Sequence, residues 1–504
     1  MTPSGNPPAP VAQAIPDDCA VLEVAEMYAA DKAAADAGVD SLVLMEAAGT
    51  AVVRVIEARW QRRPVTVLCG PGNNGGDGFV VARLLAEKGW HITVGLLGAA
   101  ESLKGDAAVN AQRWNAIGNI LPLAADLLAG DPLVVDALFG AGLSRGLEGA
   151  ARTIVTAIND RRLSCIAVDV PSGVHGDSGE VLGDGGAARC AVTVTFFRPK
   201  PAHFLYPARD LMGELVVADI GIPVKVLAPI HPRTAHNTPA LWDLPQRKWS
   251  DHKYDRGYAV VIGGDVMTGA SRLAARAARR AGAGLLRMAV PESVVALYAA
   301  DAPGAFVQAL ETEADLDELL ADTRRNGVLI GPGAGVGAVT RARVLKILGT
   351  GKAAVLDADA ITSFEDDPET LLEAIAAAKG AVVLTPHDGE FRRLFKDSAG
   401  SRLARARTAA AASRAIVVLK GADTVVAAPD GRAAIASNAP PWLATGGSGD
   451  VLAGFILGLL VQKMPPWSAA CAGVWLHGEA GRRAGRGLIA EDLPEALREI
   501  FASI

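Results

Sequence analysis

Cysteine is scarce in this chain of 504 residues: there are five cysteines, far apart, with no CxxC pair. An odd number at such spacing excludes a disulfide framework and offers no zinc site. We expect all five to be small buried apolar residues, as in a protein of the reducing cytoplasm. They are Cys19, Cys69, Cys165, Cys190 and Cys471.

Aromatic residues make up only 5% of the chain, so the hydrophobic core must come mainly from alanine, valine, leucine and isoleucine. The longest apolar run, residues 451–461, is too short to cross a bilayer. Residues 1–18 are rich in proline and alanine but have neither a basic start nor an apolar segment. We expect them to be a disordered tail rather than a signal peptide, in a soluble cytoplasmic protein.

The chain also lacks a large excess of charge of one sign. Its formal net charge is −6, spread along the sequence. A mildly acidic balance of this kind argues against nucleic acid and against an acidic membrane surface as partners.

Glycine, by contrast, is abundant, with 55 residues. Short apolar strands such as residues 65–69 and 353–356 alternate with glycine turns and alanine-rich helical stretches. Continuous β-branched runs of this length are typical of parallel strands buried on both faces. The sequence therefore predicts an α/β fold class with parallel sheets.

At this length two or three domains are expected. The alternation stops around residues 222–250, which are dense in proline and lack periodicity. We predict a linker at residues 226–244 between two α/β domains, residues 19–225 and residues 245–504. Alanine-rich helices that expose one face also suggest a homo-oligomer.

One stretch of the second half carries the strongest chemical signal. Gly446, Gly447 and Gly449 leave the backbone bare, and Asp450 then opens an apolar helix. Amides at a helix N-terminus bind phosphate, and a carboxylate beside them can take a proton from an attacking hydroxyl. The alternative is a glycine turn in which Asp450 only caps the helix.

Four further loops of this half follow apolar strands, so we expect them to gather at one edge of a parallel sheet. Lys420 could neutralise phosphate charge or lie at a strand end on the surface. His387 could contact a ligand, but a local hydrogen-bonding role is the more common one. Asp357 and Asp359 could act through Mg²⁺ or cap the next helix. The loops are residues 331–335, 356–360, 384–390 and 419–424.

The first half has its own group of polar loops. Residues 70–78 follow a strand and carry Asn73, Asn74 and Asp77, in a spacing that is neither GxGxxG nor a Walker A loop. Two later strand ends carry Asp136, Asp169 and Ser172. Each alone could be a capped turn, but together they favour an oxygen-lined pocket, with room for a monovalent cation.

The first-half motifs GPGNNGGDG, VDALFGAGLSRG and VDVPSG, with LMEAAG upstream, closely resemble the NAD(P)H-hydrate epimerase domain. The resemblance implies a Rossmann-like three-layer domain and proton transfer by Asp77 or Asp169, with the choice between them open. It implies contacts to the hydrated nucleotide from Asn73, Asn74, Gly75, Gly76, Asp77, Gly140, Ala141, Gly142, Leu143, Ser144, Arg145, Gly146 and Asp169. It implies potassium binding through Asn74, Asp136 and Ser172. One departure is Phe197, where the family usually has glycine.

The second-half motifs GPGAG, LDADAI, LTPHDGEF, LKGADT and ATGGSGDVLAG resemble, in order, the ADP-dependent NAD(P)H-hydrate dehydratase of the ribokinase-like superfamily. The resemblance implies a second three-layer domain with Asp450 as catalytic base. It implies hydrated-nucleotide contacts from Ala270, Gly333, Gly335, His387 and Asp450. It implies adenine-nucleotide contacts from Lys420, Gly421, Ala422, Asp423, Thr424 and Gly449. Departures are Ser448, where threonine is usual, and residues 265–267.

The two resemblances together imply a nicotinamide nucleotide repair enzyme. It would interconvert R and S NAD(P)HX and dehydrate the S epimer to NAD(P)H with ADP and Mg²⁺, releasing AMP and phosphate. One alternative is a ribokinase-like kinase for a small alcohol with a regulatory first domain. Another is a first domain that only senses nucleotides. A dinucleotide dehydrogenase is disfavoured because no GxGxxG fingerprint follows any strand.

Overall fold

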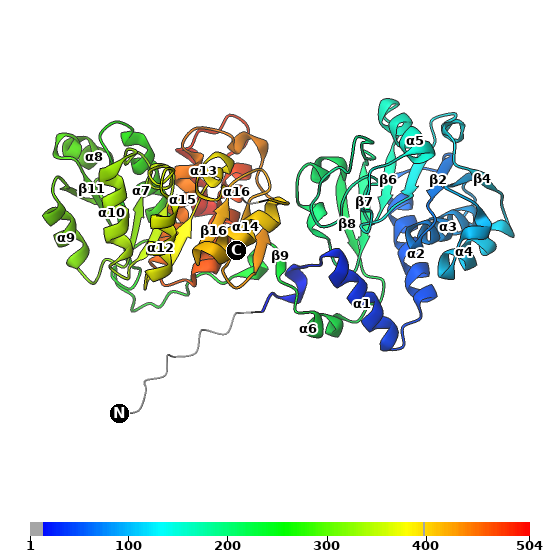
Figure 1. Ribbon diagram of the computed structural model, residues 1–504, viewed down its shortest axis with the longest axis horizontal. Helices are drawn as coiled ribbons and strands as arrows, with labels where there is room; N and C mark the ends of the chain where they lie inside the picture. The colour runs from blue at the N-terminus through cyan, green and yellow to red at the C-terminus, as the bar shows by residue number, and fades with distance from the viewer. Residues whose placement is uncertain (1–13, 397–398) are drawn as a thin grey trace. The chain divides into compact units, whose positions relative to one another are not determined.

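The computed structural model describes residues 14–396 and 399–504. The chain forms two compact units (Figure 1). The N-terminal unit comprises residues 20–234, and the C-terminal unit comprises residues 235–504 together with the segment up to Cys19. Both are α/β units built on largely parallel sheets, which confirms the predicted fold class.

The N-terminal unit contains a seven-stranded parallel sheet in the order β4-β3-β2-β5-β6-β7-β8. The strands are β2 (Val65–Cys69), β3 (Ile92–Leu96), β4 (Ile120–Pro122), β5 (Leu133–Ala137), β6 (Cys165–Val168), β7 (Val192–Phe196) and β8 (Glu214–Ala218). The helices are α1 (Val24–Asp36), α2 (Ser41–Arg59), α3 (Asn73–Glu87), α4 (Gly105–Asn115), α5 (Gly149–Asp160) and the short α6 (Leu227–Ile230).

Side-chain alternation along β2 assigns the helices to the two faces of this sheet. Val67 and Cys69 point toward α3, where Gly78 lets the helix approach: a Cβ on Gly78 would lie 2.9 Å from Cys69 Sγ. Leu68 points the other way, into a core shared with α5. The unit therefore has three layers, with the sheet in the middle.

In the C-terminal unit the strand order runs β9-β18-β17-β16-β15-β14-β13-β10-β11-β12. All neighbours from β16 to β12 are parallel, while β17 pairs antiparallel with both β16 and β18. The strands are β9 (Thr234–His236), β10 (Tyr258–Ile262), β11 (Leu285–Val290), β12 (Phe306–Ala309), β13 (Gly327–Ile330), β14 (Ala353–Leu356), β15 (Val382–Leu384), β16 (Ile416–Leu419), β17 (Val425–Ala427) and β18 (Ala433–Ile435).

Small residues let two helices of this unit pack closely against each other. A Cβ on Gly454 would lie 2.2 Å from the Ala274 carbonyl oxygen, and one on Gly458 would lie 2.4 Å from that of Ala278. Helices α7 and α15 share one apolar core with α16, as the alanine-rich sequence predicts. The helices are α7 (Thr268–Arg280), α8 (Val295–Asp301), α9 (Glu313–Ala321), α10 (Ala338–Leu348), α11 (Asp359–Thr362), α12 (Pro368–Ala377), α13 (Asp388–Leu394), α14 (Arg402–Ser413), α15 (Ser448–Leu460), α16 (Pro466–Ala484) and α17 (Asp492–Phe501).

Two expectations about irregular segments need correction. Of the predicted disordered tail 1–18, residues 1–13 lie outside the described residues, but Asp17–Cys19 form a 3₁₀ helix and Cys19 is buried in the core of the C-terminal unit. The predicted linker 226–244 contains α6 and the strand β9, and it buries Trp242. Elements of three or four residues are too short to show the periodicity that would have revealed them.

All five cysteines are buried and free, as expected. None of the helices in the described ranges combines the length and the apolar character that a bilayer crossing requires.

Candidate active sites

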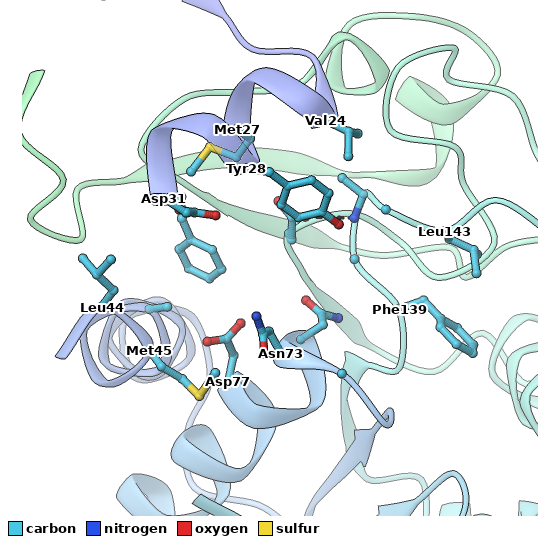
Figure 2. A pocket seen from close by; sticks show the side chains of 18 of the residues that line it. Val24, Met27, Tyr28, Asp31, Leu44, Met45, Asn73, Asp77, Phe139 and Leu143 are labelled. Carbon is cyan, nitrogen blue, oxygen red and sulfur yellow. Dashed lines mark hydrogen bonds between the residues drawn. The ribbon is translucent and has the colours of Figure 1, made fainter. Parts of the chain in front are cut away.

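The N-terminal unit has a cavity of about 580 Å³ at the carboxyl ends of its central strands (Figure 2). The loops after β2 and β5 line it, together with Asp169 after β6 and residues of α1, α2 and α3. Most of the predicted epimerase residues line this cavity. They are Asn73, Asn74, Asp77, Gly140, Ala141, Gly142, Leu143, Ser144, Arg145 and Asp169.

The remaining predicted nucleotide contacts of this unit, Gly75, Gly76 and Gly146, lie outside the lining of that cavity. A Cβ would lie 1.9 Å from the Gly70 carbonyl oxygen at Gly75, 2.7 Å from Met45 Sδ at Gly76 and 2.8 Å from the Leu182 carbonyl oxygen at Gly146. These glycines are thus required by close packing behind the loops. The sequence shows that a glycine is present but not which neighbour it accommodates.

Asp136 and Ser172 come together from two strand ends. Asp136 is completely buried and accepts hydrogen bonds from the Ser172 hydroxyl at 2.6 Å and the Ser172 backbone N–H at 2.8 Å. Burial raises the pKa of Asp136, although both hydrogen bonds oppose the shift. Asn74 lines the neighbouring cavity, and its buried amide nitrogen has no hydrogen-bond partner. The carboxylate and hydroxyl oxygens of this set fit a monovalent cation. The unsatisfied Asn74 nitrogen is a donor and instead lacks a hydrogen-bond acceptor.

Asp169 is held by three donors. Its carboxylate accepts hydrogen bonds from Lys200 Nζ at 2.7 Å, from the Thr195 hydroxyl at 3.0 Å and from the Ala141 N–H at 2.9 Å. Burial by itself would raise the pKa of Asp169, but the Lys200 ammonium and these hydrogen bonds lower it to about 2. Asp169 is therefore a fixed anion.

Asp77 shows the opposite shift. Burial and the negative charges of Asp169 and Asp31 raise its pKa well above the ordinary value, against the influence of Lys200. Asp31 of α1 also has a raised pKa, of about 6. Burial is the main cause, Lys200 lowers the pKa and Asp169 raises it. The cavity therefore combines one fixed anion with two carboxyl groups that hold protons more readily than usual.

Asp31 was not among the predicted site residues. The available signal was a carboxylate on the otherwise apolar face of a helix, three residues after Tyr28 and four after Met27. That pattern is weak in a single sequence, because a half-buried aspartate has many structural roles.

Phe197 has a backbone conformation that favours glycine. Its φ of 59° lies in the left-handed region, and its side chain is only 3% exposed. The Arg198 guanidinium lies over the ring at 4.5 Å. The Phe197 ring is therefore packed inside the unit beneath an arginine.

In the C-terminal unit the predicted loops meet at the carboxyl ends of the parallel strands. Lys420, after β16, forms an ion pair of 2.6 Å with the buried Asp357, after β14. Its ammonium also lies 3.8 Å from Glu390. Lys420 is thus an interior partner of carboxylates rather than a surface residue, and Asp357 does not cap the next helix.

Asp450 lies in the first turn of α15, beside this pair. Burial, followed by the negative charge of Asp357, raises the pKa of Asp450 to about 7, while Lys420 acts in the opposite direction. Gly447 has a left-handed φ of 87°, and a Cβ on Gly449 would lie 3.4 Å from Lys420 Nζ. A proton acceptor thus adjoins a bare backbone turn and a cation.

His387 and Ser448 form local contacts. His387 Nδ1 accepts a hydrogen bond from the Gly389 N–H at 2.9 Å and so caps α13. This is the local hydrogen-bonding role, the more common of the two predicted from the sequence. The Ser448 hydroxyl lies 2.9 Å from Nε2 of His477, whose pKa is lowered to about 4 by burial. Ser448, which stands where threonine is usual in the family, therefore contacts a neutral histidine through its hydroxyl.

The loop 420–424 is fixed from within. Arg402 forms an ion pair of 2.9 Å with Asp423, and Thr424 Oγ1 donates a hydrogen bond to the Gly421 carbonyl. At the other predicted contacts, Gly335 donates its N–H to Asp359 at 2.9 Å. A Cβ on Gly333 would lie 2.3 Å from the Met267 carbonyl oxygen, so the glycine-rich loop packs on the segment 265–267 that precedes Ala270.

Comparison with known proteins agrees with this geometry. Residues 259–502 match the NAD(P)H-hydrate dehydratase family, and residues 41–202 match the YjeF-related protein N-terminus family. The chain is 38% identical to the bifunctional NAD(P)H-hydrate repair enzyme Nnr of Moorella thermoacetica, over 96% of this chain and 97% of that one. It is 37% identical to the Thermofilum pendens protein of the same name, over 95% and 96%.

Among solved structures, an ADP/ATP-dependent NAD(P)H-hydrate dehydratase from Bacillus subtilis, co-crystallised with ATP and Mg²⁺, is 29% identical. The match covers 52% of this chain and 94% of that one, with a TM-score of 0.45. The identity of 38% and 37% over nearly the full length of these relatives decides the family. This chain belongs to the bifunctional NAD(P)H-hydrate repair enzymes.

Proposed function

We propose that this chain epimerises R and S NAD(P)HX in its N-terminal unit and dehydrates the S epimer in its C-terminal unit, using ADP. The observation that carries the proposal is the position of Asp450, beside a bare glycine turn and Lys420, in a chain whose other unit holds a carboxylate-lined cavity. The predicted domains, 19–225 and 245–504, correspond to these two units apart from their ends.

In the dehydratase unit Asp450 would take the proton of the C6 hydroxyl as that oxygen attacks the β-phosphorus of ADP. The bond from that phosphorus to the bridging oxygen breaks, and AMP leaves. Phosphate then departs from C6 with the oxygen, C5 releases a proton to the solvent, and the C5=C6 double bond of the ring is restored. A pKa of about 7 suits Asp450 to accept a proton near neutrality.

The backbone of residues 446–449 and the Lys420 ammonium would face the phosphate groups. Asp450 has Asp357, Asp359 and Glu390 as charged neighbours besides Lys420. Within the described residues no three of these carboxylates are grouped closely enough to hold a cation by themselves. Since Mg²⁺ is commonly bound by one or two carboxylates together with substrate phosphates, we assign Mg²⁺ to the phosphate groups of ADP beside Asp450. When bound, Mg²⁺ would neutralise charge on the phosphate oxygens.

We place the remaining nucleotide contacts where the motifs predict them. The hydrated nucleotide would lie against Ala270, Gly333, Gly335, His387 and Asp450, and the adenine nucleotide against Gly449 and the loop 420–424. Since the loop 420–424 is braced by Arg402, its backbone is fixed before a ligand arrives.

In the epimerase unit Asp136, Ser172 and Asn74 would hold potassium, whose charge would complement the buried Asp136 carboxylate. The loop 140–146 and Asn73 would bind the nucleotide. Asp77, whose pKa is raised, is the better proton carrier than Asp169, because three hydrogen-bond donors already occupy the Asp169 carboxylate.

The test supplies mixed-epimer NADHX with ADP and Mg²⁺ and follows the return of reduced-nicotinamide absorbance. Recovery of essentially all the substrate is expected, with the S fraction recovered directly and the R fraction after epimerisation. If the protein left NADHX untouched and phosphorylated a small alcohol instead, the kinase alternative would hold and this proposal would be wrong.

A further inference from the structure

Helix α1 forms one wall of the epimerase cavity, although it precedes the residues that match the family model. The residues that it contributes recur at helical spacing, so they share one face. They are Val24, Met27, Tyr28, Asp31 and Ala35. The helix is fixed at its start, where the Val24 N–H donates a hydrogen bond of 2.7 Å to Asp177.

The packing of Tyr28 shows that α1 is fitted to the catalytic loops. A Cβ on Gly142 would lie 2.3 Å from the Tyr28 hydroxyl oxygen, so the bare backbone of the loop after β5 makes room for this side chain. A side chain on Gly142 would therefore force the exposed Tyr28 ring to move. The wall that carries Asp31 is thus held at the helix start and contacts the loop through Tyr28.

Within the described part of the chain, the carboxylates of Asp31 and Asp77 have no hydrogen-bond or ion-pair partner, whereas Asp169 has three donors. Figure 2 shows Asp31 on α1 and Asp77 on α3 on different sides of the cavity. The charged groups that act on Asp31 are Asp169 and Lys200, and burial keeps its pKa at about 6. Two unoccupied carboxylates therefore face the same space from two helices.

We propose that Asp31 is a catalytic residue of the epimerisation, acting with Asp77 from the opposite side of the C6 carbon. The inference rests on the epimerase function proposed above. An epimerase must offer proton transfer on both faces of the carbon that it inverts, and α1 supplies the second face.

The step follows from the chemistry of C6, which carries a hydroxyl and is bonded to the ring nitrogen N1. One carboxylic acid protonates the hydroxyl, the C6–O bond breaks and water leaves. The N1 electron pair forms an N1=C6 double bond, which leaves C6 planar. Water adds to the other face while the opposite carboxylate takes its proton and the N1=C6 pair returns to nitrogen. One water leaves and one enters, and no oxidant is needed.

The two carboxyl groups exchange roles in the reverse direction, so each must hold a proton in one direction and release it in the other. Asp169, fixed as an anion by Lys200, is unsuited to this exchange. It instead keeps the loop after β5 in place through the Ala141 N–H.

The test compares Asp31→Asn with Asp36→Asn in the full chain. Asp36 is the matched control, because it lies on the same helix but is exposed and paired with Lys32. Conversion of the R epimer should slow at least about 100-fold in Asp31→Asn, as for a lost general acid or base, with KM almost unchanged. Asp36→Asn should keep the wild-type rate, and Asp31→Glu should recover part of it. Dehydration of pure S epimer should be normal in all three, and an unfolding transition of the N-terminal unit that matches wild type shows that this unit is folded.

A second measurement follows oxygen exchange at C6. In water labelled with heavy oxygen and without ADP, wild type should incorporate one solvent oxygen for each inversion. Inversion without exchange, or wild-type epimerisation by Asp31→Asn, would overturn the proposal while leaving the epimerase function intact. A wild-type protein that does not epimerise would instead overturn the proposed function itself.

Discussion

The two candidate sites share an arrangement of one lysine among several carboxylates, but we assign different reactions to them. In each, a buried lysine pairs with one aspartate, Lys200 with Asp169 and Lys420 with Asp357, and nearby carboxylates without such a partner have raised pKa values. The site in the C-terminal unit adds a bare glycine turn for phosphate. The N-terminal cavity instead adds a helical wall with a further carboxylate. In the N-terminal unit the lysine thus keeps Asp169 charged, while Asp77 and Asp450, which form no such ion pair with any residue that the structure describes, can carry a proton.

The strongest test of this comparison removes one proton acceptor only. Asp450→Asn should lower the dehydration rate at least about 100-fold, because the amide cannot take the hydroxyl proton. Epimerisation by the same variant, followed by the change in the ratio of R to S NADHX, should stay at the wild-type rate and serves as the control. Dehydration within a few-fold of wild type would show that Asp450 is not the base.

Removing the lysine should affect the fold as well as the chemistry. Lys200→Met leaves Asp169 buried without its cation and should lower the unfolding free energy of the N-terminal unit by about 3 kcal/mol. The pKa of Asp169 is about 2 in the folded protein against roughly 3.9 unfolded. The pair therefore stabilises the fold above about pH 4, and this stability is lost as pH falls toward 2.

Denaturant unfolding at neutral and acidic pH measures this effect. Wild type and Lys200→Met should converge in stability as the pH approaches 2. Lys88→Met is the matched control, since it breaks an exposed pair with Glu57 and should cost less than about 1 kcal/mol. Equal losses from both variants would contradict the assigned role of Lys200.

The smallest effect is a shift in pH dependence. Asp450 must be ionised to accept a proton, so kcat/KM for dehydration should be high above about pH 7 and fall as pH decreases through that value. Asp359→Asn removes one of the negative charges that raise the pKa of Asp450. The decrease of kcat/KM should therefore occur at a pH lower by up to about one unit. A decrease at an unchanged pH in Asp359→Asn would show that Asp359 does not act on Asp450.

Much of each site could be predicted because the chemistry is local in sequence. Asp77 and Asp450 lie beside glycine at helix starts, and Asp136 and Asp169 lie at strand ends, positions that a sequence pattern marks. Asp31 could not be predicted in this way, because it lies in the middle of a helix. Its place in the cavity depends on how α1 packs against the loop at Gly142.

The same distinction explains the errors. The segment 226–244 lacks periodicity, but β9 forms there because the sheet of the C-terminal unit offers an edge to pair with. The ligand contact of His387 stays a prediction, but the sequence pattern did not show that its imidazole also caps α13. A pattern gives the position of a side chain along the chain but not the group that it meets.

The sequence by itself determined the two α/β units, the order of their loops and the reactive residue types, since these follow from strand periodicity, glycine turns and motif spacing. Only the tertiary structure decided the protonation states. A pKa depends on which charges lie within a few ångströms. Against the effect of burial in both cases, Lys200 lowers the pKa of Asp169 from 31 residues away in the chain, and Asp357 raises the pKa of Lys420 from 63 residues away.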